Sequence, residues 1–313
     1  MNKLALILLI AILVSLECNA EENKRTQGWM DPWRDATVAI GRVMEVSVQQ
    51  PNGSMAKKNI FAVVGTGVIF GLPDDPSGTP WLVTAKHIFY DPTKEPVWEP
   101  DYLQIRFSWF ESKPIDQYLG LRIDIKANGK SLWLAHPNND VDLACIPIKF
   151  TSKEVGKNTV SGITLANFAT TDDIYEGAPI AVLGYPAAVG ANFWTRAIVR
   201  QGIIAWASPI QPETQKILVD CNLFPGNSGG PVFKLATGTD REGNFAIGGR
   251  VAFLGIVSQR EMEELPVKFG GKELIAQDDK GKSIPVISLN SLGIGVIEPA
   301  SRVKELLIEA SKR

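Results

Sequence analysis

The sequence predicts an all-β protein made of two antiparallel β-barrels and a C-terminal helix. Most of the chain reads as short strands, because apolar, β-branched and aromatic residues alternate or run together between clusters of Gly, Pro, Asn and Asp. A polar stretch at about 151–171 separates these runs into two groups. Many short strands, a central linker and one terminal helix favour two barrels over a helical or alternating α/β fold.

The N-terminus has the pattern of a secretory signal peptide over residues 1–20. Lys3 precedes an apolar run from Leu4 to Leu16, and a polar stretch then ends at Ala20. We expect cleavage after Ala20. The run of thirteen residues is shorter than the ~20 needed to cross a bilayer. An uncleaved membrane anchor is the alternative, and no later segment is apolar enough to span. The sequence therefore predicts an exported protein, either periplasmic or secreted.

The remaining chain divides into two expected domains. Residues 21–150 should form an N-terminal β-barrel, and residues 151–313 a C-terminal β-barrel with the closing helix. The strand-like runs are 36–49, 61–70, 102–110 and 121–125 in the first domain, and 178–185, 195–207, 216–221 and 251–258 in the second.

Two helices and one insertion complete the expected elements. A single helical turn is expected near 84–89. The tail begins with Pro299 and Ser301 and then places apolar residues at helical spacing. The charged, Gly-rich stretch from Glu261 to Ser283 is predicted to be a surface excursion.

Composition argues against several classes of function. With 45% hydrophobic and 21% charged residues, the chain is ordinary for a globular protein. The net charge of −2 gives no basic patch and argues against a nucleic-acid partner. Two histidines without an HExxH or CxxC pattern make no recognisable metal site, and no cofactor is implied. The mature chain would keep Cys145 and Cys221, too few for a disulfide scaffold, and we expect both to be buried thiols.

The segment CNLFPGNSGGPVF (221–233) contains a candidate nucleophile. Gly226, Gly229 and Gly230 surround Ser228, and glycine allows backbone conformations closed to other residues. Such a turn can present the Ser228 hydroxyl together with the N–H groups of Gly226 and Ser228, which would form an oxyanion hole. A plain Gly-Pro hairpin turn is the alternative.

A base and an acid for this serine can be chosen from few candidates. His87 directly follows an apolar strand, whereas His136 lies in a Pro-Asn turn and is expected at the surface. Asp142 precedes a buried apolar run, where a carboxylate needs a partner; Asp140 is expected in a solvated turn. The order His, Asp, Ser along the chain is that of chymotrypsin. In this triad Ser228 attacks the scissile carbonyl, His87 takes its proton and Asp142 orients the imidazole.

The chain resembles the trypsin-like (chymotrypsin-fold) serine proteases through four motifs. These are GTG at 65–67, TAKH at 84–87, DLA at 142–144 and GNSGGP at 226–231. The resemblance implies two six-stranded barrels and peptide-bond hydrolysis through an acyl-enzyme, with protein or peptide substrates. It places Asn222 at the base of the specificity pocket and Ile256 and Ser258 on its wall strand. None of the three is acidic, so cleavage after apolar residues is expected rather than after Lys or Arg.

Within this family the chain is most similar to the bacterial HtrA branch, through residues 182–205 and 293–307. HtrA proteins usually carry a PDZ domain after the protease. This sequence has no stretch for one, so gating through a PDZ domain is not expected. The 261–283 insertion is also unlike the compact family core.

Two other functions are alternatives to a secreted serine endopeptidase. The main rival to a secreted serine endopeptidase is a catalytically silent binding or adhesion module, but such scaffolds usually lose a triad member. An esterase of another fold would need a nucleophile elbow and a histidine last in order.

Asn227 stands where digestive enzymes have the aspartate that pairs with a new N-terminus, so no activating cut is expected. The sequence does not give the oligomeric state.

Overall fold

The computed structural model describes residues 30–72, 78–107, 120–149, 162–189, 196–277 and 283–312. The expected signal peptide 1–20 lies outside these residues, as do the ends of some predicted strands and much of the 151–171 linker. The chain divides into two compact units, Met1–Pro32 and Trp33–Arg313, and only residues 30–32 of the first are described. Within the described residues, no helix has both the length and the apolar character needed to cross a bilayer.

The N-terminal half of the second unit is a seven-stranded antiparallel sheet. Its strands are β1 (Thr37–Gln49), β2 (Met55–Phe70), β3 (Trp81–Thr84), β4 (Tyr102–Arg106), β5 (Gly120–Asp124), β8 (Leu134–Ala135) and β9 (Ala144–Pro147). They pair in the order β5-β4-β1-β2-β3-β9-β8. The short pair β6 (Lys126–Ala127) and β7 (Lys130–Ser131) follows β5. Alternating residues such as Leu103, Ile105 and Ile123 face one buried core, as the period of two requires.

The C-terminal half is a closed six-stranded barrel. Its strands are β10 (Pro179–Gly184), β11 (Ile198–Trp206), β12 (Ile217–Asp220), β13 (Pro231–Lys234), β16 (Ala252–Pro266) and β21 (Ile287–Pro299), paired in the order β10-β11-β12-β21-β16-β13. Apolar residues from these strands, including Ile180, Val219 and Ile297, form a second core. Burial of their side chains, at about 25 cal/mol per Å² of apolar surface, is the main force that closes the barrel.

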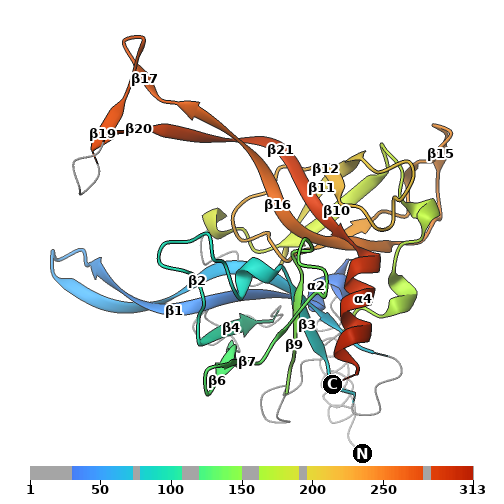
Figure 1. Ribbon diagram of the computed structural model, residues 1–313, viewed down its shortest axis with the longest axis horizontal. Coiled ribbons are helices and arrows are strands. Elements are labelled where there is room, and N and C mark those ends of the chain that lie inside the picture. Colours follow the sequence, from blue (N-terminus) through green and yellow to red (C-terminus); the bar gives the residue numbers. More distant parts are fainter. Residues whose placement is uncertain are drawn as a thin grey trace, which may run out of the picture. The chain divides into compact units, whose positions relative to one another are not determined.

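Short elements and one helix complete the unit. The 3-10 turns are η1 (Lys86–Ile88), η3 (Leu165–Asn167), η4 (Thr171–Asp173) and η5 (Ala187–Val189), and α2 (Asp31–Asp35) precedes β1. Helix α4 (Ala300–Ala310) starts directly after β21 and buries Val303, Leu306 and Leu307. It contacts both β16 and β9, so it packs against strands of both halves (Figure 1). The predicted C-terminal helix is confirmed.

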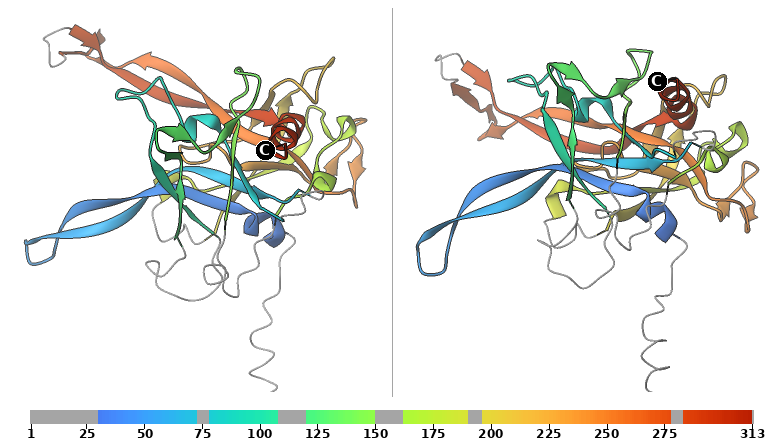
Figure 2. Two further views of the ribbon diagram at one scale, coloured as in Figure 1. Left: turned by 60° about the horizontal axis from the view of Figure 1, so that its bottom comes forward. Right: turned by 90° about the horizontal axis from the view of Figure 1, so that it is seen from below.

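Two long hairpins project from the N-terminal sheet and from the C-terminal barrel (Figures 1 and 2). One is the outer part of β1 and β2, where residues from Arg42 to Gln49 are mostly exposed. The other is the outer part of β16 and β21. It carries the small strands β17 (Lys268–Phe269), β18 (Lys272–Glu273), β19 (Ile275–Gln277) and β20 (Ser283–Pro285), whose residues are exposed. The described residues of the 261–283 stretch therefore form a surface excursion, built as the continuation of two barrel strands.

The all-β class predicted from the sequence is confirmed, with one difference in detail. The C-terminal barrel closes, whereas the described strands of the N-terminal half form an open order that ends at β5 and β8. Cys145 and Cys221 are buried, and neither takes part in a disulfide. Burial raises the pKa of the Cys221 thiol; the charge of Asp220 acts in the same direction and that of Arg200 opposes it.

Candidate active site

The pairing of β3 with β9 brings His87 and Asp142 together. Thr84 lies opposite Ala144 in this antiparallel pair, so the residues just after β3 run beside those just before β9. The Lys86 N–H donates to the Asp142 carbonyl at 3.2 Å, which continues the alignment into the turn. This alignment places His87, the residue after Lys86, beside Asp142.

The Asp142 carboxylate contacts both the backbone N–H and the ring of His87. The His87 N–H donates to Asp142 Oδ1 at 3.0 Å, and Asp142 Oδ2 lies 2.7 Å from His87 Nδ1. Because a carboxylate accepts, Nδ1 carries a proton and Nε2 is left to accept one. This is the tautomer that a general base needs.

Ser228 lies in a turn that only glycine can build. Gly226 and Gly229 have φ of 96° and 84°, in the left-handed region that other residues avoid. A Cβ on Gly229 would lie 1.9 Å from the Thr66 carbonyl oxygen, and one on Gly226 would lie 2.4 Å from that of Tyr185. The turn therefore requires glycine for space as well as for conformation.

The peptide between Pro225 and Gly226 is oriented by a hydrogen bond. The Ala187 N–H donates to the Pro225 carbonyl at 2.8 Å, so the N–H of the same trans peptide points the other way. The Asn227 N–H donates to the Phe224 carbonyl at 3.0 Å, which together with Pro225 and positive φ at Gly226 describes a type II turn. Among the described residues, no acceptor takes the N–H of Gly226 or of Ser228. Both groups are free to bind a developing oxyanion.

Thr66, in β2, clamps this turn from the N-terminal sheet. Its Oγ1 donates to the Gly226 carbonyl at 2.6 Å and accepts the Tyr185 N–H at 3.0 Å. Its N–H donates to the Ser228 carbonyl at 2.8 Å. Thr66 is fully buried, so these bonds are shielded from water and join the two halves of the unit at the candidate nucleophile.

His87, Gly226 and Ser228 line one cleft of about 820 Å³. The segment from Asp91 to Asp101 forms much of its wall, where the Trp98 indole N–H donates to the Ile88 carbonyl at 2.9 Å. No hydrogen bond joins Ser228 Oγ to His87 among the described residues; such bonds are often long before substrate binds. The cleft has room for a peptide segment beside the three residues.

Asp91 is one of three acidic residues that line this cleft, together with Glu99 and Asp101. Burial alone would raise the pKa of Asp91, but hydrogen bonds from Thr93 and the charges of Lys94 and His87 outweigh it and lower that pKa. Asp91 therefore stays ionised and adds a negative charge to the wall of the cleft.

Three of the predicted site residues lie elsewhere. Ile256 and Ser258 are almost fully buried in the barrel, and Asn222 is exposed. None of them lines the cleft that holds His87 and Ser228. Their role in a specificity pocket stays a prediction.

The expectation that His136 lies at the surface is wrong. Its side chain is only 1% exposed, and its Nε2 lies 3.1 Å from Glu305 Oε2. Helix α4 packs over the segment that contains β8 and covers this histidine. Asp140 is exposed, as expected for a solvated turn.

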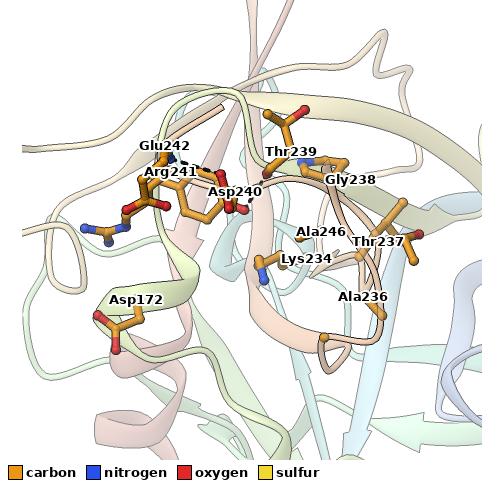
Figure 3. Close-up of a pocket in the computed structure, with 14 residues that line it drawn as sticks. Asp172, Lys234, Ala236, Thr237, Gly238, Thr239, Asp240, Arg241, Glu242 and Ala246 are labelled. Carbon is orange, nitrogen blue, oxygen red and sulfur yellow. Dashed lines mark hydrogen bonds between the residues drawn. The ribbon is translucent and has the colours of Figure 1, made fainter. Parts of the chain in front are cut away.

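A second cavity, of about 300 Å³, lies away from these residues. Figure 3 shows Asp240, Arg241 and Glu242 on one side of it and Ala236 and Thr237 on the other. The Tyr175 hydroxyl donates to the Thr239 carbonyl at 2.8 Å, and the Glu242 N–H to Asp240 Oδ1 at 3.1 Å. Neither His87, Asp142 nor Ser228 lines this cavity.

Comparisons with known proteins give the family. Residues 65–239, more than half of the chain, match the family model described as a trypsin-like peptidase domain, so the chain belongs to that family. A protease-type function, with protein or peptide substrates, follows from this membership. No curated protein sequence matches the chain.

Among solved structures, the chain is similar to an inactive form of a serine-to-alanine mutant of Rv3671c from M. tuberculosis H37Rv. The sequence identity is 14%, the TM-score is 0.39, and the match covers 88% of this chain and 86% of that one.

Two residues that support the site, Thr66 and Glu298, were not predicted from the sequence. Thr66 sits inside the GTG motif, but nothing there indicates that its hydroxyl holds the serine turn. Glu298 Oε1 accepts the Asp142 N–H at 3.1 Å. The sequence gives one signal for this residue, because a carboxylate inside the apolar run GIGVIEPA needs a buried partner.

Proposed function

We propose that this chain is an exported serine endopeptidase that uses His87, Asp142 and Ser228 as its triad. The observation that carries the proposal is the 2.7 Å contact between Asp142 Oδ2 and His87 Nδ1. His87 in turn lines the same cleft as Ser228. A silent scaffold has no need to keep this pair beside an intact serine turn.

The proposed mechanism follows from the roles of these groups. Ser228 Oγ attacks the scissile carbonyl carbon while His87 Nε2 takes the hydroxyl proton, and Asp142 stabilises the imidazolium. The N–H groups of Gly226 and Ser228 bind the oxyanion. His87 then gives its proton to the leaving amine, and water hydrolyses the acyl-enzyme by the same steps. Each oxyanion donor is worth about 10²- to 10³-fold in rate.

We also propose the finer assignments made from the sequence. The domain division at residue 150 is supported by two separate cores, since the apolar residues of one lie between Val38 and Ile148 and those of the other between Ile174 and Ile297. Export and cleavage after Ala20 rest on the signal pattern of residues 1–20. Placement near the HtrA branch rests on the motifs of residues 182–205 and 293–307.

The test is fluorophosphonate labelling together with cleavage of casein. We expect the wild-type chain to be labelled on Ser228 and to cleave casein, and Ser228→Ala to do neither. His87→Ala should lose about 10⁶-fold in kcat and Asp142→Ala about 10⁴-fold, with a double variant little worse than the worse single. Thermal unfolding of each variant controls for loss of fold.

Two outcomes would count against the proposal. Casein cleavage by Ser228→Ala at the wild-type rate would remove the assigned nucleophile. A folded wild-type chain that is neither labelled nor active on any peptide library would favour the silent binding module.

A further inference from the structure

Glu298 is a buried carboxylate that the proposed triad does not use. It lies near the end of β21, and its side chain is only 1% exposed. A buried charge destabilises a fold unless it is paired and hydrogen-bonded. The partners of Glu298 therefore indicate why the carboxylate is present.

Both partners of Glu298 are at its Oε1 atom. The Asp142 N–H donates to Oε1 at 3.1 Å, and Lys216 Nζ lies 3.2 Å from the same oxygen. Lys216 is 42% exposed, so its ammonium is partly hydrated while it neutralises the buried carboxylate. Glu298 and Lys216 also line a cavity of about 330 Å³, together with Asp140 and Val141.

With Glu298 in place, the main chain of Asp142 is fixed on both sides. Its N–H is held by Glu298 from the barrel, and its carbonyl accepts the Lys86 N–H from the turn that carries His87. Fixing both groups sets the direction of the Asp142 side chain, whose carboxylate then meets His87 at 2.7 Å. Glu298 belongs to the barrel that also carries Ser228, whereas Asp142 precedes β9 of the N-terminal sheet.

We propose that Glu298 is a positioning residue. It holds Asp142, and through Asp142 also His87, in a fixed position relative to the barrel that carries Ser228. Lys216 neutralises the Glu298 carboxylate, so Glu298 Oε1 can accept the Asp142 N–H without leaving an unpaired charge beside Asp142. This inference rests on the proposed function for its catalytic consequence, but the geometry it asserts has its own readout.

The kinetic test compares three variants. Glu298→Ala removes the acceptor and should lower kcat by about 10- to 100-fold with little change in KM, the size of effect that misplaced catalytic groups produce. Glu298→Gln keeps an oxygen that can accept the Asp142 N–H, so it should recover most of that loss. Glu305→Ala is the matched control, because Glu305 reaches the same segment but contacts His136 instead of Asp142. It should leave kcat at the wild-type value.

A proton NMR measurement separates positioning from catalysis. The chain has two histidines, so the signal of the His87 Nδ1 proton can be assigned by its loss in His87→Ala. The short bond to Asp142 should shift this signal downfield in the wild-type chain and in Glu298→Gln. In Glu298→Ala it should move upfield or broaden. This readout needs no peptidase activity, so it decides on Glu298 even if the proposed function fails.

A fourth variant covers the case in which Glu298→Ala does not fold. Glu298→Leu with Lys216→Met replaces both charged groups by apolar ones of similar size, an exchange that is often neutral for stability. It still lacks the acceptor and should show the same loss of kcat and of the downfield signal. Wild-type kcat and an unshifted Nδ1 signal in the folded double variant would overturn the proposal. A loss of kcat that Glu298→Gln does not recover would also overturn it.

Discussion

Arg200 places a positive charge beside the residue that the family resemblance puts at the base of the specificity pocket. Its Nη1 donates to the Asn222 carbonyl at 2.8 Å, and its guanidinium lies 4.4 Å from the centre of the Phe224 ring. If Asn222 forms the base of the pocket, as the resemblance implies, a cation beside it repels a substrate side chain of the same sign. The charge supports the expectation that the chain does not cleave after Lys or Arg.

We therefore predict cleavage after small or medium apolar residues, by at least about tenfold in kcat/KM over Lys or Arg. Arg200→Gln should narrow this ratio, while Arg122→Gln, which removes an exposed arginine from the N-terminal sheet, should not. A peptide-library profile of each chain measures the ratio. A wild-type profile dominated by Lys or Arg before the cut would contradict the prediction.

The role of a single residue can be predicted from the sequence when its contacts are made with residues nearby in the chain or in neighbouring strands. His87 and Asp142 were found because each flanks an apolar strand, and β3 and β9 then pair in register. His136 was misjudged because its Pro-Asn turn looks exposed until α4, far away in sequence, covers it. Glu298 and Thr66 act on residues more than 150 positions away, and no local pattern reports such a contact.

At the scale of elements, β2 supports the serine turn through Thr66. The buried Oγ1 satisfies the Gly226 carbonyl and the Tyr185 N–H together. Thr66→Val keeps the shape but leaves both groups unpaired, which should lower the free energy of unfolding by about 1–3 kcal/mol.

Because the turn carries the proposed oxyanion donors, Thr66→Val should also lower kcat by about 10- to 100-fold. Thr66→Ser, which keeps the hydroxyl, is the control and should stay near the wild-type rate. Urea unfolding and steady-state kinetics measure the two effects. An unchanged kcat in folded Thr66→Val would show that the turn holds its shape without the clamp.

The 3-10 turn η4 depends on an ionised Asp173. Burial alone would raise the pKa of Asp173, but hydrogen bonds from Thr170 and the charge of Arg250, whose Nη2 lies 2.7 Å away, outweigh it and lower that pKa. The unfolded chain, with a carboxyl pKa of about 3.9, then binds a proton more readily than the folded one. The stabilisation is present above about pH 4 and is lost as the pH falls through the folded-state value.

Asp173→Asn should accordingly lower the free energy of unfolding at pH 7 by about 1.5–3 kcal/mol. It should also flatten the fall in stability below about pH 4. Asp124→Asn, at an exposed ion pair of β5, should change neither. Urea unfolding between pH 7 and pH 2.5 gives both quantities, and equal slopes for wild type and Asp173→Asn would refute the role of this carboxylate.

At the scale of the whole molecule, the all-β class followed from periodicity, because one buried face imposes alternation on each strand. The continuation of β16 and β21 into an exposed hairpin did not follow from it. The segment from Glu261 to Ser283 is charged and Gly-rich, which is typical of a loop, and the pairing of Glu263 with Asn290 is made between residues far apart in the chain. A barrel in the second half was predicted, but the pairings that close it, such as Val219 with Gly295, are not specified by sequence patterns.

Asn227 links this architecture to how the enzyme would become active. It is almost fully buried, and its Nδ2 has no hydrogen-bond partner among the described residues. Being neutral, it cannot serve as the counter-ion of a buried N-terminal ammonium. The serine turn is held instead by Thr66 and by the Ala187 N–H, contacts that need no new chain end.

We predict that removal of the signal peptide is the only processing that activity requires. Chains beginning at Glu21, Lys24 and Gly28 should have equal kcat/KM on one peptide, and acetylation of their α-amino groups should not change it. Asn227→Asp, which buries a carboxylate without a cation, should lower the melting temperature in all three chains. Activity confined to one of these chains, and lost when its α-amino group is acetylated, would mean that a terminal ammonium orders the turn after all.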